Sequence, residues 1–356
     1  MAAAASTVAQ LAGGPSDRAA AYSALEGTRD AALAASCAEA LVAVLGMPAS
    51  EVDGTEWRRC SLVLAHLAQI DPVRVGGECY KELRALSTFA EGNAADAILQ
   101  KPLEHMTKDD ARTLAAGWAG LAAMAAKGSD PVFAAAGVGA FELLGAWATK
   151  NLYATFLMPE DDRNLRVMEL TLAVLREDRS ELSEAEVCGA WYLLAFGLIQ
   201  GRAAVGLYAV QSGAVALAVA ELRRSPPADW ISVSQTPSGK FGAVLCGIQQ
   251  CAVSCPPEHL HLVAATPRLL DVFLDVLKSY EAAGPRDADH TAVVYTTAAL
   301  ASCCDPLFAF SEVNRTAVRG AASSIRFLLG NPLASLTDIG MTTASLGVRK
   351  HVIPLV

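Results

Sequence analysis

Cysteine and histidine residues of the kind that ligate metal ions gather in one stretch, at Cys246, Cys251, Cys255, His259 and His261. Cys251 and Cys255 are four residues apart and would share a helix face, and two prolines separate them from the histidines. Zinc sites commonly take ligands from short Cys-x-x-Cys-like knuckles, which this spacing does not match. We therefore expect packing cysteines beside two solvent-facing histidines, with a metal site that forms by convergence in space as the alternative.

A catalytic cysteine would need a neighbouring histidine to lower the pKa of its thiol. His66 follows Cys60 in the same apolar segment but on a different helix face, so we expect it to be a satisfied core or interface residue. The adjacent pair Cys303 and Cys304 would point in different directions along a helix. The sequence therefore predicts no catalytic residue and no cofactor, with an enzyme whose site forms only in three dimensions as an alternative.

Short motifs for nucleotide or hydrolytic chemistry do not occur in the chain. There is no phosphate-binding glycine loop, no His-Glu-x-x-His and no Gly-x-Ser-x-Gly. The acidic pairs 109–110 and 161–162 are interpreted as charges at helix N-termini, where the helix dipole favours them. The odd number of cysteines, nine, in a chain without a secretory signal predicts reduced thiols and no disulfides.

Aromatic residues near expected helix ends are the candidates for partner binding, because tryptophan and tyrosine dominate interface energetics. Trp147, Tyr153 and Trp230 occupy such positions. Asn151, four residues after Trp147, could hold a peptide backbone through its amide. For the three aromatic rings, local packing is the leading interpretation and binding at the surface the alternative; together with Asn151 they are the candidate binding residues of the chain.

The amino-acid composition limits the classes of partner that the chain is expected to bind. Hydrophobic residues make up 53% of the chain, aromatic residues 6% and charged residues 18%, so its apolar content is mainly the small aliphatics that suit helix packing. A net charge of −9 argues against nucleic acid as the main partner. The most apolar stretch, Val187–Ile199, is shorter than a membrane span requires. Without a secretory signal we expect a cytoplasmic protein, with a nuclear location or a transit peptide as alternatives.

A two-part unit recurs along the chain, and each part has helical periodicity. The first parts are Arg18–Leu25, Cys60–Ile70, Ala111–Ala126, Cys188–Ile199, Gly242–Cys255 and Thr291–Cys304. The second parts are Cys37–Leu45, Gly77–Leu86, Gly137–Trp147, Gly213–Arg224, Pro267–Leu277 and Ala321–Leu329. No run of alternating β-branched residues is long enough for a sheet. The pattern predicts an all-α fold built from about six helical couples.

Local signals place the starts and ends of these helices. Asp110 is expected to cap a helix that begins at Ala111, and Ser183 with Glu186 has the spacing of a capping box. In Pro267–Leu277, leucine and phenylalanine residues follow one helix face with charged residues opposite. Proline-containing breakers separate the couples at 225–227, 255–257, 284–285 and 331–332.

The remaining segments define the expected domain organisation. Residues 1–17 are expected to be a flexible N-terminal segment, 18–335 the repeat array, and 336–356 a terminal cap or truncated helix. Gly92–Lys108 and Leu152–Ser180 are interpreted as inserted or third helices, and Arg223–Lys240 as a long loop.

The segment QSGAVALAVAELRR, at Gln211–Arg224, resembles the second half of an armadillo repeat. Weaker versions occur at Cys37–Leu45 and Gly137–Trp147, and Cys60–Ile70 is similar to the preceding helix of that repeat. The resemblance implies a right-handed α-solenoid of armadillo/HEAT-like repeats with a concave groove that binds peptides or proteins. In importin-α-like members the groove carries a ladder of Trp–Asn pairs, but here only Trp147 and Asn151 fit that pattern.

We therefore expect a non-enzymatic scaffold or adaptor that binds a protein or an extended peptide through its groove, centred on residues 137–280. The alternative is a structural subunit of a larger assembly, with its apolar faces permanently covered. Low charge content and high hydropathy favour that alternative.

Overall fold

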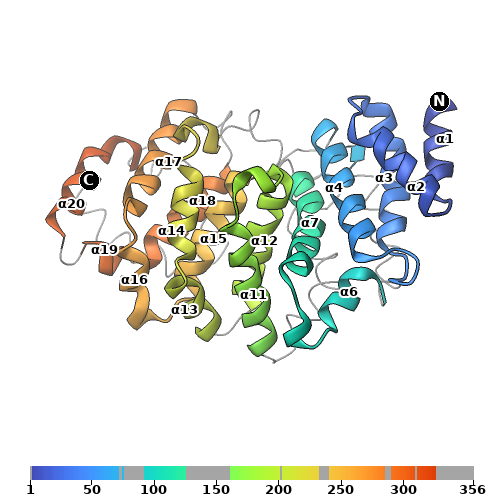
Figure 1. Ribbon diagram of the computed structural model, residues 1–356. Helices are drawn as coiled ribbons and strands as arrows, with labels where there is room; N and C mark the ends of the chain where they lie inside the picture. The colour runs from blue at the N-terminus through green and yellow to red at the C-terminus, as the bar shows by residue number, and fades with distance from the viewer. Residues whose placement is uncertain are drawn as a thin grey trace. The chain divides into compact units, whose positions relative to one another are not determined.

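The computed structural model describes residues 2–71, 74–75, 92–125, 161–200, 203–231, 240–284, 290–308 and 311–325. Within these ranges every regular element is a helix and no strand occurs, which confirms the all-α prediction (Figure 1). The chain divides into two compact units, Met1–Leu193 with Pro237–Lys240, and Leu194–Thr236 with Phe241–Val356. The boundary between the units falls within helix α12.

Helices of the first unit pack mainly against their neighbours in the chain. Helix α1 contacts α2 and α3, α3 packs on α4, α4 on α7, and α7 on α11 (Figure 1). Their bounds are α1 (Ala2–Leu11), α2 (Pro15–Glu26), α3 (Ala31–Leu45), α4 (Gly54–Ile70), α6 (Ala94–Leu99), α7 (Lys108–Ala125), α11 (Asp161–Leu175) and α12 (Glu184–Gln200), with 3₁₀ turns η1 (Leu103–His105) and η2 (Arg179–Glu181).

The N-terminal residues differ from the sequence prediction. The expected flexible segment 1–17 contains α1 and the start of α2. Leu11, at the end of α1, is fully buried, and α1 packs on α2 and α3. Alanine has the highest helix propensity, so the Ala-rich start of the chain favours a helix once its leucine has an apolar surface to cover.

Caps and apolar stripes explain why α3 and α4 form where they do. The carboxylate of Asp30 accepts hydrogen bonds from two backbone N–H groups of α3, and that of Asp53 accepts one from Glu56 N at 2.8 Å. Trp57 is fully buried between the two helices, and its indole N–H donates to Leu45 O at 2.9 Å. That bond satisfies the ring's only polar group, so the tryptophan can pack in the core.

Helices α7 and α12 approach each other closely at a glycine. A Cβ added to Gly189 would lie 1.8 Å from Ala115 O, so no larger side chain fits between the two backbones. Helix backbones reach this separation only where a small residue stands at the crossing point. The contact fixes the packing of α12 on α7 within the first unit.

The second unit also consists of helices that pack on near neighbours. Helix α13 contacts α14 and α16, α17 contacts η3, α14 and α18, and α19 contacts α16, α18 and α20 (Figure 1). The bounds are α13 (Ala203–Gln211), α14 (Ala214–Leu222), η3 (Pro227–Ile231), α15 (Lys240–Ser254), η4 (Pro257–His259), α16 (Leu260–Ala264), α17 (Leu269–Ala283), α18 (His290–Ser302), α19 (Cys304–Phe308) and α20 (Glu312–Gly320).

Helix α17 has the amphipathic face that its sequence predicts. Phe273 and Leu274 are 0% and 4% exposed, whereas Asp271 and Lys278 on the other side are exposed. The helix ends at Ala283, and Gly284 follows with φ of 79°, a conformation that glycine adopts without strain. The predicted breaker at 284–285 therefore marks the end of this helix.

The recurring helical segments correspond to helices wherever the structure describes them. The six predicted first parts overlap α2, α4, α7, α12, α15 and α18. Three second parts overlap α3, α14 and α17, and the described start of Ala321–Leu329 is helical at 322–325, while Gly77–Leu86 and Gly137–Trp147 lie outside the described residues. The predicted insertion Gly92–Lys108 contains α6 and η1, and the described part of Leu152–Ser180 contains α11. Residues 336–356 lie outside the described part of the chain.

Candidate binding cleft

Acidic side chains gather where the N-terminal ends of α4, α7 and α12 meet in the first unit. Each helix carries carboxylates in its first turn, where the helix dipole favours negative charge. Arginines from adjacent helices then pair with several of these carboxylates. This set of charges joins successive helices and forms the polar end of the first unit.

Arg18 of α2 forms the first of these interhelical ion pairs. Its Nε donates to Glu56 Oε1 at 2.6 Å and its Nη2 to Glu56 Oε2 at 3.1 Å. Tyr22 OH donates to the same carboxylate at 3.1 Å. Arg18 is only 4% exposed, and its hydrogen bonds to Glu56 raise the pKa of the guanidinium above its usual value. A two-point contact of this kind fixes α2 on α4 with a defined orientation.

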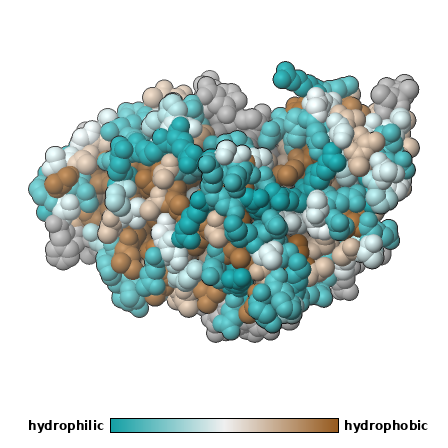
Figure 2. Space-filling view, in the orientation of Figure 1, coloured by the Kyte–Doolittle hydropathy of each residue, from teal (hydrophilic) through white to brown (hydrophobic). Residues whose placement is uncertain are grey.

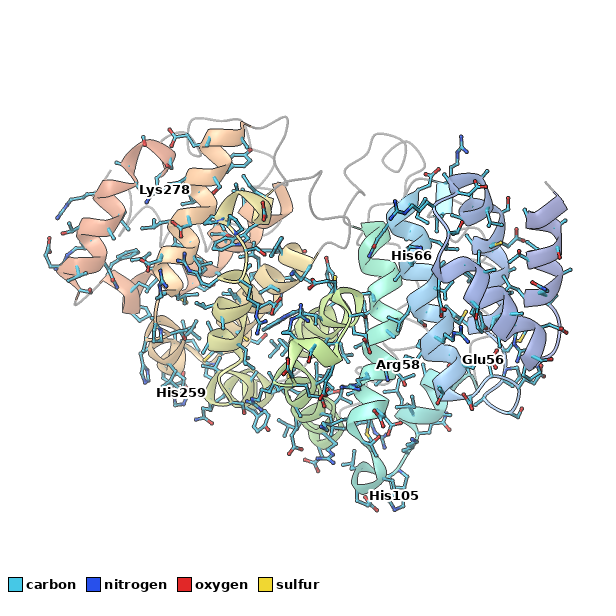
Figure 3. All side chains as sticks on the ribbon, turned by 45° about the horizontal axis from the view of Figure 1, so that its top comes forward. Glu56, Arg58, His66, His105, His259 and Lys278 are labelled. Carbon is cyan, nitrogen blue, oxygen red and sulfur yellow. The ribbon has the colours of Figure 1, made fainter. Side chains whose placement is uncertain are left out.

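Arg58, two residues after Glu56 on α4, forms an ion pair with Glu186 of α12. Helix α4 is therefore linked to α2 through Glu56 and to α12 through Arg58. Figure 3 labels Glu56 and Arg58 at the same end of α4, away from His66. Ser183 N donates to Glu186 Oε2 at 2.9 Å and Glu186 N to Ser183 Oγ at 3.2 Å, which confirms the predicted capping box. Burial opposes ionisation of Glu186, but the Ser183 and Arg58 bonds outweigh it and lower the pKa of the carboxyl.

Glu177, which follows α11, receives two cations from the first turns of α7. Lys108 Nζ lies 2.7 Å from Glu177 Oε1, and Arg112 donates to Oε2 of the same carboxylate. Burial again opposes the charge, and the two cationic partners more than compensate, so the pKa of Glu177 is lowered. Burial alone would lower the pKa of the Arg112 guanidinium, but its hydrogen bond and charge interaction with Glu177 raise that pKa above its usual value.

Beside these ion pairs lies an open cleft of about 320 Å³ between α4, α6 and α7. Its accessible apolar wall is formed by Ala97 of α6, with Ala94 and Ile98 almost fully buried at 2% and 4% exposure, and its rim carries the exposed residues Asp53 and Asp109. The complete lining is Ala49, Asp53, Gly54, Thr55, Ala94, Ala97, Ile98, Lys101, Asp109, Asp110 and Thr113. The cleft therefore combines an aliphatic wall with two solvent-exposed negative charges.

Asp110 has a different role from the one that the sequence predicts. Helix α7 begins at Lys108, so Asp110 lies inside its first turn and does not precede it. Its Oδ2 accepts from Thr107 N at 2.9 Å, and Asp110 N donates to Thr107 Oγ1 at 3.3 Å, which makes Thr107 the capping residue. Lys101 Nζ lies 2.6 Å from Asp110 Oδ1, so this carboxylate is already paired within the cleft.

The charge balance of the cleft favours a cation. Three carboxylates and one ammonium line it, which gives a formal charge of −2. The N-termini of α4 and α7 contribute about half a positive charge each, so roughly one negative charge remains. An isolated anion would therefore be repelled, and a cationic group with an aliphatic stem would match both the wall and the rim.

Of the four candidate binding residues, the structure describes Trp230 alone, and Trp230 is not among the residues that line this cleft. Trp147, Asn151 and Tyr153 lie outside the described residues. Trp230 is 1% exposed, its N–H donates to Ser225 O at 3.1 Å, and the Arg223 guanidinium lies 5.6 Å from its ring. The ring of Trp230 therefore packs locally, because η3 folds it into the core of the second unit; residues 232–239 of the expected loop lie outside the described residues.

The cysteines of the cysteine–histidine stretch are buried, and of its histidines His261 is exposed and His259 half-buried. Cys246, Cys251 and Cys255 are buried, and burial raises the pKa of Cys246 and of Cys251 to about 12. Among the described residues, no group of three or more His, Cys, Asp and Glu is arranged to hold a metal ion. His261 is exposed and its ring centroid lies 6.2 Å from that of His259. Thiols with such pKa values stay protonated near neutral pH and are poor nucleophiles.

His66 likewise takes the expected interface role. It is half-buried, and its Nε2 lies 3.1 Å from Thr28 O in the turn between α2 and α3. The histidine thus links α4 to the preceding helical couple.

No single one of the described helices is long and apolar enough to cross a bilayer, and only α13 and α14 together, bent by 58°, meet that length and composition.

Comparison with known proteins adds no family to this description. No protein-family model matches the chain, and neither curated proteins nor solved structures give a match.

Proposed function

We propose that the chain is a scaffold of armadillo/HEAT-like helical repeats that binds a partner protein or an extended peptide. The observation that carries the proposal is the open cleft at the N-terminal ends of α4 and α7. In this arrangement α4, α7 and α12 are equivalent helices of successive repeats, because their N-termini share one end of the unit. Helices stacked in this way present a row of similar helix ends to a partner.

Packing between neighbours supports the repeat interpretation. Helices of the first unit contact the preceding and following couples, as in arrays where each repeat covers its neighbour's apolar side. Arg18 and Arg58 link α4 to helices on both sides with ion pairs. Buried arginine–carboxylate pairs add orientation to an otherwise aliphatic packing surface.

The described surface favours a transiently bound partner and argues against a subunit whose apolar faces are permanently covered. Among the described residues the exposed large apolar side chains are Val253 and Val313, at 56% and 78% exposure. On the face drawn in Figure 2, apolar residues form small separate areas among polar ones. Obligate interfaces are larger and more apolar than this. The high hydropathy of the chain comes from Ala, Leu and Val that helix packing buries.

The predicted groove around residues 137–280 remains a second part of this proposal. Trp147, Asn151 and Tyr153 belong to it as binding residues, with the tryptophan as the main apolar contact. Replacing Trp147 by alanine is expected to weaken binding and leave the protein soluble. Loss of soluble expression in that variant would assign the ring to the core instead.

Affinity capture with the full chain from native cell extract, followed by mass spectrometry, tests the proposed function. The expected result is a partner that is recovered in less than stoichiometric amount and lost at high salt. A partner retained in constant ratio through size-exclusion chromatography would favour the assembly-subunit alternative. Recovery of no specific partner would contradict both.

A further inference from the structure

The chemistry of the cleft between α4, α6 and α7 specifies the partner more closely than the proposed function does. Resting on that function, we infer that the cleft receives a lysine or arginine side chain from a basic segment of the partner polypeptide. Two exposed carboxylates and an aliphatic wall, placed together in one open cleft, are the features that select this occupant.

The size of the cleft suits one or two side chains. Its volume of about 320 Å³ is at the lower end of the range for ligand pockets. The methylene groups of a lysine or arginine would lie against Ala97, which is exposed, and Ala49, which is half-buried. Long cationic side chains commonly bury their stems in this way while the charged end stays near water.

The cationic end would meet the carboxylates of Asp53 and Asp109. Both residues are exposed at the rim, so pairing them with a guanidinium or ammonium removes little water from either charge. Asp110 already pairs with Lys101 at 2.6 Å and supplies no further charge. The two rim carboxylates are therefore the ones that discriminate a basic partner from a neutral one.

The net charge of the whole chain also favours a basic partner. The net charge of −9 attracts a basic segment over a distance comparable to the Debye length. Such attraction raises the association rate and is weakened by salt. The cleft then decides where the basic side chain is held.

Substitutions that remove charge without removing structure are available at both rim positions. Asp53 caps α4 through a bond to Glu56 N at 2.8 Å, and asparagine caps helices as well as aspartate does. Asp109→Asn changes an exposed side chain in the first turn of α7. Glu39→Gln, at an exposed position of α3 outside the cleft, is the matched control for loss of charge in the same unit.

The experiment selects peptides from a phage-displayed library of random twelve-residue sequences with the full chain as target. Enriched peptides are then measured by fluorescence anisotropy against wild type, Asp53→Asn/Asp109→Asn and Glu39→Gln. We expect enriched peptides to share a lysine or arginine. Their affinity should fall about three- to tenfold in the double variant and stay unchanged in the control.

Replacing the shared basic residue of the peptide by methionine completes a double-mutant cycle. The replacement should weaken binding to wild type and have little further effect on the double variant. Peptides without basic residues, or equal binding to wild type and the double variant, would overturn the inference and leave the scaffold function standing. Failure of wild type to enrich any peptide would contradict peptide binding itself, and the inference with it.

Discussion

Replacing Gly189 by alanine tests whether α7 and α12 pack as closely as the structure has them. The added Cβ would lie 1.8 Å from Ala115 O, whereas real Cβ contacts are essentially never shorter than 3.0 Å. The difference, 3.0 − 1.8 = 1.2 Å, is the smallest shift that the two backbones must make. Neither group is the end of a flexible side chain, so the strain must be relieved by moving a helix.

Gly189→Ala is expected to destabilise the protein, whereas replacing glycine by alanine inside a helix ordinarily stabilises it. Alanine in place of glycine normally stabilises a helix interior by about 1 kcal/mol. Overpacking of a rigid contact costs about 3 kcal/mol at the upper end of its usual range. We therefore expect Gly189→Ala to lower the free energy of unfolding of the first unit by about 2 kcal/mol, or its Tm by roughly 5 °C.

Thermal unfolding followed by circular dichroism measures this change, and hydrogen exchange resolved by peptide locates it. Exchange should accelerate in α7 and α12 of the variant. Gly54→Ala is the control, because nothing lies within 4 Å of a Cβ added there, and it should change stability by no more than about 0.5 kcal/mol. A Gly189→Ala protein as stable as wild type would refute the close packing of these helices.

Three further changes probe the core, the ion pairs and the thiols. Leu274→Asp should cost more than about 4 kcal/mol in urea unfolding, because it places an unpaired charge where the leucine is 4% exposed. Lys278→Asp, on the exposed side of the same helix, should have little effect, and equal losses would contradict the assigned face. Because the folded-state pKa of Glu186 is lowered, its contribution to stability is present above the ordinary glutamate pKa and is lost as pH falls through the lowered value. Glu186→Gln should therefore make stability less dependent on pH in that acidic window, and an unchanged pH profile from circular dichroism would count against the ion pair. Cys246 and Cys251, with pKa about 12, should resist iodoacetamide at pH 8 until urea is added; rapid labelling of the folded protein, read by peptide mass spectrometry, would show that they are accessible.

Much of the helical framework could be predicted because it depends on local sequence. The stripe of α17 and the capping box of Ser183 and Glu186 involve residues close together in the chain, and both occur as expected. The helix at the N-terminus was harder to predict, because an alanine-rich stretch without charges carries no periodic pattern. Its helix depends on the burial of Leu11 against α2 and α3, which is a tertiary effect.

The cleft could not be predicted because its parts are distant in sequence and individually ordinary. Asp53 caps one helix and Asp109 lies in the first turn of another, and each position is explained fully by the helix dipole. Alanines of α6 form the wall between them, and alanine carries no signal for binding. Only the packing of α4 on α7 places these residues around one cavity.

Trp230 is a residue whose two possible roles, local packing and binding, could be told apart only in the structure, which shows local packing. Its place in a segment rich in serine and proline predicted an exposed loop. In the structure η3 directs the ring inward, where Arg223 covers it and Ser225 O accepts its N–H. Composition identified the break between helices but contains no information on which way the connecting residues fold.

Hydrogen exchange of the full chain with and without its captured partner tests whether the cleft is the binding site. We expect slower exchange on binding in residues 49–55 and 94–113, which contain the cleft and the helix ends around it. Protection confined to other segments, with these residues unchanged, would contradict the assignment of the cleft as the binding site.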